Sequence, residues 1–193
     1  MEKEVLKRIF EFLEEKGEHN APLLWKLEND IPITEKDLDF EGDLILTYSD
    51  IELLPEGLNV RGELDLFGSK LTSLPKGLKV ENNLTLYQSK ITSIPKGLKV
   101  GGNFNLIETK ITSLPEGLEV GGDLDLQGSY VESLPEGLEV GGDLDLRDTN
   151  IKSLPKGLKV GGSLFIKQRG LTKYTDDQLR EMIKPGFIKG NIY

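Results

Sequence analysis

Carboxylates are the side chains of this sequence that could do chemistry, because they cluster where the usual nucleophiles and bases are missing. The 193-residue chain has no cysteine, and its one histidine, His19, lies in a polar segment without a second ligand at metal spacing. Aspartates, by contrast, recur two and twenty residues apart, as Asp123, Asp125, Asp143 and Asp145. Their oxygens could bind a divalent cation, although no complete calcium-loop motif surrounds them, or they could attract a basic protein surface.

Three interpretations of this acidic region stay open from the sequence alone. Between Glu116 and Asp148 there are ten acidic residues and one basic residue, Arg147. Such a block can be a solvated surface, an electrostatic docking site for a basic partner or a weak divalent-cation site. Like charges directly opposite each other destabilise paired strands. Four aspartates at matching positions therefore require a reason.

A 20-residue repeat places these aspartates beside one another. The motif Leu/Ile-Pro-x-Gly-Leu occurs six times without an insertion, at Pro55, Pro75, Pro95, Pro115, Pro135 and Pro155. Apolar residues at i and i+2, such as Leu144 and Leu146, predict one short strand in each repeat. A second pair after Pro-x-Gly, such as Leu158 and Val160, predicts another strand. Stacked coils would bury all of these side chains in one continuous core.

Three corners are expected to close each coil. Pro-x-Gly predicts a type I turn with proline at position i+1 and glycine at i+3. Pairs such as Gly141-Gly142 mark a second corner, and because they follow valine and do not open a helix, they are not phosphate-binding loops. A column of small hydroxyl residues is expected to bond the backbone of the neighbouring coil: Ser49, Ser69, Ser89, Thr109, Ser129 and Thr149.

The pattern Leu-x-Leu-x-x-Thr-x-Ile-x-x-Leu-Pro, as in residues 144–155, resembles the leucine-rich repeat in its short, 20-residue bacterial version. The resemblance covers residues 38 to about 173 and implies a protein-binding solenoid. Threonine or serine stands where that family usually has asparagine, so a three-sided β-helix is an alternative geometry. The closing segment MIKPGFIKGNIY is similar to the ends of leucine-rich repeat proteins of gut bacteria and large bacteriophages. The cysteine-dependent ubiquitin ligase domain of some bacterial members does not carry over, because the chain has no cysteine.

We therefore expect a leucine-rich-repeat-like solenoid of about seven coils with short parallel strands, over residues 38–173, capped at both ends by helices. The N-terminal helical cap is residues 1–37, in which residues 2–16 carry an apolar face that packs with Trp25 against the first coil. The C-terminal cap, residues 174–193, begins with a capping box from Thr175 to Gln178. Its helix ends at Lys184-Pro185-Gly186, and residues 187–193 are expected to add an edge strand.

The predicted function is a non-enzymatic protein-binding module that needs no cofactor. Its binding surface is the strand face from Glu63 to Lys167, where exposed apolar residues would anchor a partner and the aspartates would steer it. The predicted contact residues are Glu63, Asp65, Phe67, Tyr87, Ile107, Asp123, Asp125, Asp143, Asp145, Arg147 and Phe165.

The expected partner is a protein with a basic surface, and the phage resemblance implies a host protein, such as a defence component. The net charge of −9 disfavours direct binding to nucleic acid, and no stretch approaches 18 apolar residues, so no membrane span is expected. The N-terminus lacks the apolar segment of a signal peptide, which favours the cytoplasm. Two alternatives stay open: an acidic DNA-mimic inhibitor of a nucleic-acid-binding enzyme, and a structural or virion-associated protein. The oligomeric state also stays open.

Overall fold

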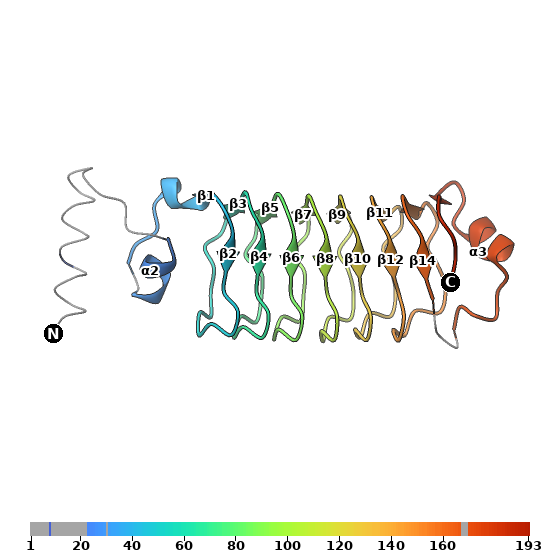
Figure 1. Cartoon of the computed structure of the whole chain (residues 1–193), viewed down its shortest axis with the longest axis horizontal. Coiled ribbons are helices and arrows are strands. Elements are labelled where there is room, and N and C mark those ends of the chain that lie inside the picture. Colours follow the sequence, from blue (N-terminus) through green and yellow to red (C-terminus); the bar gives the residue numbers. More distant parts are fainter. Residues whose placement is uncertain (1–7, 9–22, 30, 167–169) are drawn as a thin grey trace.

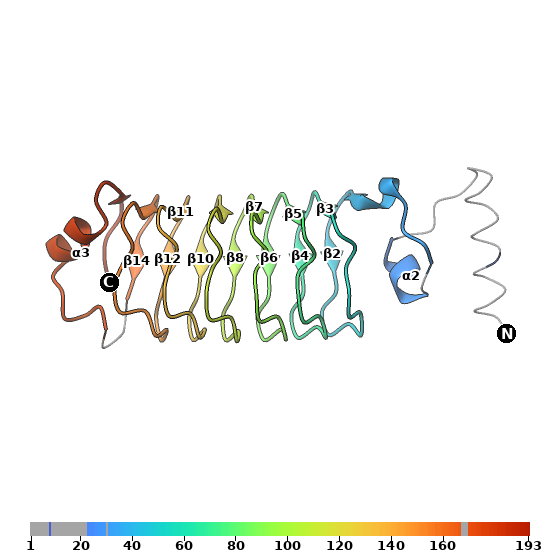
Figure 2. The same ribbon diagram turned by 180° about the vertical axis from the view of Figure 1, so that it is seen from behind.

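The computed structural model, which describes residues 8, 23–29, 31–166 and 170–193, is a parallel β-solenoid (Figure 1). Each 20-residue coil contributes two short strands, and the coils stack side by side along one axis, as the view from behind in Figure 2 also shows. The predicted repeat solenoid with short parallel strands and terminal helices is therefore confirmed. None of the helices in the described part of the chain is long and apolar enough to cross a membrane.

The strands form two parallel sheets in which each strand pairs with its counterpart in the next coil. The eight-stranded sheet consists of β1 (Asp39–Phe40), β3 (Asn59–Val60), β5 (Lys79–Val80), β7 (Lys99–Val100), β9 (Glu119–Val120), β11 (Glu139–Val140), β13 (Lys159–Val160) and β15 (Phe187–Ile188). The seven-stranded sheet consists of β2 (Leu44–Ile45), β4 (Leu64–Asp65), β6 (Leu84–Thr85), β8 (Phe104–Asn105), β10 (Leu124–Asp125), β12 (Leu144–Asp145) and β14 (Leu164–Phe165). The third side of the coil carries an isolated bridge between Ser113 and Ser133.

The core is a set of apolar columns that run the length of the solenoid. Leu64, Leu84, Leu124 and Leu144, at the start of their strands, are fully buried, and Phe104 fills the same position in β8. The valines of the eight-stranded sheet point inward from the other side, as Val140 does at 3% exposure. Because strand side chains alternate between two faces, the residues beside these columns face outward.

The Pro-x-Gly corner is a different turn from the one that the sequence predicted. The backbone N–H of Leu78 donates to the carbonyl of Pro75 over 3.4 Å, which places proline at position i and Gly77 at position i+2. Gly77 has a φ of 73°, and a positive φ at i+2 is the requirement of a type II turn. The type I assignment is therefore wrong, because the proline precedes the two central residues of the turn.

The column of small hydroxyl residues also behaves differently from expectation. The hydroxyls of Thr109 and Thr149 donate to the carbonyls of Leu106 and Leu146, at 2.8 and 3.0 Å. These bonds lie within one coil, three residues back along the chain, whereas the prediction placed such bonds in the neighbouring coil. The buried hydroxyl oxygens of four serines have no hydrogen-bond partner in the described part of the chain: Ser49, Ser69, Ser89 and Ser129. The column favours small residues because the corner is buried.

The N-terminal end of the solenoid is covered by α2 (Leu23–Glu28) and the 3-10 helix η1 (Glu35–Leu38). Leu23 joins the hydrophobic core. Lys26 is fully buried, and its Nζ lies 2.9 and 2.8 Å from the two carboxylate oxygens of Asp37. Asp37 Oδ2 also accepts hydrogen bonds of 2.7 Å from the backbone N–H and the hydroxyl of Thr34. This ion pair ties α2 to η1. Apart from Arg8, the residues of the helix expected over 2–16 lie outside the described part of the chain.

The C-terminal end is a final coil that contains α3 (Asp176–Met182). The capping box is confirmed: the Gln178 N–H donates to Thr175 Oγ1 at 3.3 Å, and the Thr175 N–H donates to Gln178 Oε1 at 2.9 Å. After α3, β15 pairs with β13, and the chain end pairs with β14 through a bridge between Leu164 and Ile192. The expected edge strand is thus present, and it extends both sheets by one coil.

Candidate functional site

The outward side of the seven-stranded sheet, which we term the seven-stranded face, is where the predicted binding residues lie. Register pairing puts Asp65 beside Thr85, Asp125 beside Asp145, and Asp145 beside Phe165. The face is therefore a ladder in which residues twenty apart in sequence are neighbours. Residue 167, the predicted end of this surface, lies outside the described residues.

An aromatic stack of Tyr48, Phe67 and Tyr87 lies at the N-terminal end of this face. The ring centroids of Phe67 and Tyr87 are 5.1 Å apart with planes 5° from parallel, and those of Tyr48 and Phe67 are 4.7 Å apart at 59°. Tyr48 is 66% exposed. The predicted anchors Phe67 and Tyr87 are thus in contact, and Ile107 follows them in the next coil, half buried.

Tyr48 was not among the predicted contact residues, because it lies one position outside the column that holds Phe67. A Cβ atom added to Gly68 would lie 2.5 Å from Tyr48 Cε1, so only glycine at this position leaves room for the ring. Gly68 and Tyr48 occupy equivalent positions of neighbouring coils, both with positive φ. The signal in the sequence is a tyrosine followed, one repeat later, by glycine.

Asp123 and Asp143 belong to a ladder of side chains that bind the backbone of the next coil. Asp123 Oδ1 accepts from the Asp143 N–H at 2.7 Å, and Asp143 Oδ1 accepts from the Ser163 N–H at 2.6 Å. Asn103 Oδ1 does the same for the Asp123 N–H at 2.8 Å. These carboxylates therefore satisfy backbone donors that the short strands leave open.

Asp125 and Asp145 bind the backbone of their own coils. Each Oδ1 accepts a 2.9 Å hydrogen bond from the N–H two residues later, that of Gln127 and that of Arg147. Asn105 makes the same contact to Ile107 at 3.0 Å. All four aspartates thus have a structural role, which is one reason why like charges are tolerated here.

Arg147 neutralises part of this acidic cluster. Its Nε lies 2.9 and 2.8 Å from the two carboxylate oxygens of Asp145, and a terminal nitrogen also bonds to this carboxylate. The hydrogen bonds that Arg147 donates to Asp145 raise the pKa of Arg147 above its usual value. The guanidinium carbon lies 5.7 Å from the Phe165 ring centroid, and Phe165 stacks on Tyr193 with centroids 5.0 Å apart. Tyr193, 61% exposed, is a second aromatic residue outside the predicted set of contact residues.

The acidic region that the sequence shows as one block is spread over several sides of the coil. The aspartates lie on the seven-stranded face, whereas Glu119 and Glu139 begin strands of the eight-stranded sheet. Across residues 8, 23–29, 31–166 and 170–193, no group of three or more histidine, cysteine, aspartate or glutamate side chains is placed to hold a metal ion.

Folding disfavours the ionised form of Asp125. Burial raises the pKa of its carboxyl, the hydrogen bond from the Gln127 N–H acts in the opposite direction, and the charge of Asp145 raises the pKa further. A carboxyl whose pKa is raised by folding disfavours the folded state when it is ionised. The cost is present at neutral pH and disappears as the pH falls below the unfolded value of about 3.9.

Replacing Asp125 with asparagine is therefore expected to raise the free energy of unfolding by about 0.5 kcal/mol at pH 7, since it removes a like-charge cross-strand pair. The amide keeps the backbone acceptor, as Asn105 shows in the preceding coil. Urea unfolding at about pH 7 and about pH 3 measures the effect, which should vanish at the lower pH. Glu132→Gln, an equal charge change at an exposed position, is the control. A loss of stability in Asp125→Asn at neutral pH would contradict this account.

Comparison of the chain with protein-family models, with curated proteins and with solved structures gave no match. The function is therefore argued from the geometry of the two faces.

Proposed function

We propose that this protein is a leucine-rich repeat protein of the bacterial or phage type, and that it binds a partner protein through the seven-stranded face without catalysing a reaction. The observation that carries the proposal is the aromatic stack of Tyr48, Phe67 and Tyr87 on the outside of a strand ladder. Aromatic side chains that a rigid scaffold presents to solvent are the residues that most often dominate binding energy.

The ordered packing of the rings before binding supports the role of the aromatic stack as an anchor. Each ring rests on its neighbour, so its side chain loses less conformational freedom when a partner arrives. Ile45 is 53% exposed on the neighbouring strand and extends the apolar surface toward the first coil. The anchor would therefore be an apolar patch at the N-terminal end of the face.

Charge supports a partner with a basic surface. Beyond the aromatic stack, Asp123 is exposed and Asp125 half buried, so a partner anchored on the rings would meet negative charge further along the rod. Complementary charge raises association rates and selects against acidic partners. Following the phage resemblance, we propose a host protein of the cytoplasm as the partner.

The test is affinity purification with crosslinking from a bacterial host, followed by binding measurements with the recovered protein. Tyr87→Ala is expected to weaken binding at least tenfold, equivalent to about 1.4 kcal/mol. Asp125→Lys is expected to slow association most strongly at low salt, because it reverses a steering charge. Tyr130→Ala is the matched control, since Tyr130 is 56% exposed but lies away from the aromatic stack, in the coil's third side.

A recovered partner whose affinity is unchanged by Tyr87→Ala would contradict the proposed anchor. The DNA-mimic alternative has a distinct signature, which is competition with DNA for a basic partner that Asp125→Lys abolishes and Tyr87→Ala does not. The pairing of Arg147 with Asp145 argues against a continuous phosphate-like row on this face.

A further inference from the structure

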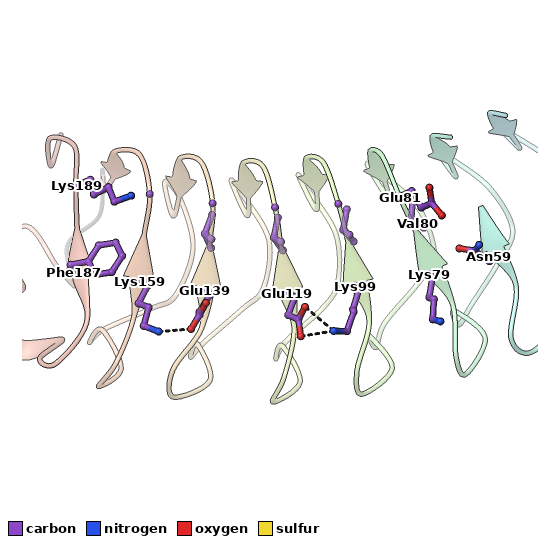
Figure 3. A pocket seen from close by; sticks show the side chains of 17 residues that line it. Asn59, Lys79, Val80, Glu81, Lys99, Glu119, Glu139, Lys159, Phe187 and Lys189 are labelled. Carbon is purple, nitrogen blue, oxygen red and sulfur yellow. Dashed lines mark hydrogen bonds and ion pairs between the residues drawn. The ribbon is translucent and has the colours of Figure 1, made fainter. Parts of the chain in front are cut away.

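The outward side of the eight-stranded sheet, which we term the eight-stranded face, carries an ordered row of charges. From β3 to β13 the row reads Asn59, Lys79, Lys99, Glu119, Glu139 and Lys159 (Figure 3). The next outward column begins with the exposed residues Arg61 and Glu81 and continues with glycines, which leave the backbone bare at Gly101, Gly121, Gly141 and Gly161. Together the two columns line a long shallow groove.

The order of these charges is electrostatically unfavourable within a single chain. Lys99 pairs with Glu119, with Nζ 2.8 Å from Oε1, and Lys159 Nζ lies 2.5 Å from Glu139 Oε1. However, Lys79 lies in register beside Lys99, and Glu119 lies beside Glu139. Like charges in register destabilise paired strands, and a strict alternation of lysine and glutamate would have avoided both contacts.

The same order of charges is complementary between two copies of the chain that are related by a two-fold axis. The junction of β7 and β9 is the centre of the eight-stranded sheet. Across this centre every charged residue of the inner four strands is matched by its opposite: Lys99 by Glu119, and Lys79 by Glu139. A two-fold axis that runs along the strands at this junction would turn the rod end for end and bring opposite charges together.

A second column has the same symmetry. The middle residue of each Pro-x-Gly motif is exposed at the turn that precedes each strand. In order along the rod these residues are Glu56, Lys76, Lys96, Glu116, Glu136 and Lys156. All three pairs across the centre are opposite in sign. In the column that follows the strands, Glu41 is matched by Lys189 at the two ends, whereas Arg61 and Glu81 face glycines across the centre.

We propose that two copies of this chain associate through their eight-stranded faces, antiparallel, about a two-fold axis at the junction of β7 and β9. Most homo-oligomers have such a two-fold, and a two-fold interface must be self-complementary. At the axis, Lys99 and Glu119 of both copies form a ring of four alternating charges. Lys79 of each copy meets Glu139 of the other copy. A parallel arrangement is excluded, because it would place each lysine on its own counterpart.

The size of the face predicts a weak, salt-sensitive dimer. Eight strands at a spacing of about 4.8 Å span about 34 Å, and one narrow face of this length is at the low end of specific interfaces. The glycine column allows close backbone approach, whereas the charged side chains are exposed and screened by salt. We expect a dissociation constant on the order of 10–100 µM at low ionic strength.

Charge reversal of the full chain, followed by sedimentation in about 0.02 M and about 0.5 M salt, tests the dimer. The acidic variant carries Lys79→Glu and Lys99→Glu, and the basic variant carries Glu119→Lys and Glu139→Lys. Each alone is expected to weaken self-association at least tenfold, because four like charges then face four like charges. A one-to-one mixture of the two variants is expected to form heterodimers, and a chain with all four reversals is expected to form homodimers again.

The control for net charge is Lys90→Glu with Lys110→Glu, which changes exposed lysines on the third side of the coil by the same amount. It should leave self-association within about threefold of the unmodified chain. Circular dichroism confirms that each variant is folded. The proposal is overturned if the unmodified chain is monomeric at about 0.5 mM in low salt, if the acidic and basic variants associate as it does, or if their mixture fails to associate.

Discussion

Replacing Phe104 with alanine is expected to lower the free energy of unfolding by about 3–5 kcal/mol, because it empties a ring-sized volume in the middle of the core. Phe104 is 0% exposed and pairs in register with Leu84 on one side and Leu124 on the other. The coils on both sides are held by inter-coil backbone hydrogen bonds, so they cannot close onto the cavity without shifting strands. Unfolding in urea, followed by circular dichroism, measures the loss.

Two further variants in the same coil serve as controls for this result. Phe104→Leu is expected to cost less, since leucine fills the equivalent position of β6 and β10, and it keeps the experiment informative if the alanine variant does not fold. Lys110→Ala, at an exposed site, is expected to change stability by less than about 0.5 kcal/mol. A loss below about 1 kcal/mol for Phe104→Ala would mean that neighbouring coils repack freely.

Replacing Asp37 with alanine is expected to cost a similar amount, about 3–5 kcal/mol, because the buried Lys26 would lose the bidentate contact with this carboxylate. Lys26 is fully buried in α2, and Asp37 accepts hydrogen bonds from both Lys26 and Thr34. Since this pair joins α2 to η1, the loss should appear first in the N-terminal cap. Hydrogen exchange of the first coils, compared with the last ones, would locate it.

The same pair predicts a dependence of stability on pH. Burial acts to raise the pKa of Asp37, but the hydrogen bonds from Lys26 and Thr34 outweigh it, and the pKa is lowered overall. The stabilisation is therefore present above the unfolded value of about 3.9 and is lost as the pH falls through the lower folded value. Asp37→Ala should lose this part of the acid dependence. The double variant Lys26→Met with Asp37→Leu, which removes both charges, should recover most of the stability.

The 20-residue period was sufficient to predict the coils, because the pairs of leucine and valine at i and i+2 have a direct meaning for strand burial. The capping box at Thr175 was predictable for the same reason, because it depends only on residues three positions apart. The turn type was mistaken because proline and glycine fit two registers of a β-turn, and only the hydrogen bond between Leu78 and Pro75 distinguishes them. The hydroxyl bond of Thr109 stays within its coil for a similar reason, since the nearest acceptor depends on the curvature of the corner.

The positions of the candidate contact residues in columns were predictable from the sequence, but the interactions among them were not. Phe67 and Tyr87 were found because they depart from the repeat on one face. Tyr48 was missed because its contact depends on the space that Gly68 leaves. The backbone hydrogen bonds of Asp123 and Asp145 depend on how coils stack, which the period alone does not specify.

The constant 20-residue period has a consequence for how the gene can change by recombination. Each strand is bonded to its counterparts in the preceding and following coils, so recombination between misaligned repeats can add or delete a whole coil and leave both caps intact. Each event would change the length of the rod by about 4.8 Å. It would also move the midpoint of the eight-stranded sheet away from the junction of Lys99 and Glu119. Selection for the proposed self-association would therefore hold the number of coils constant.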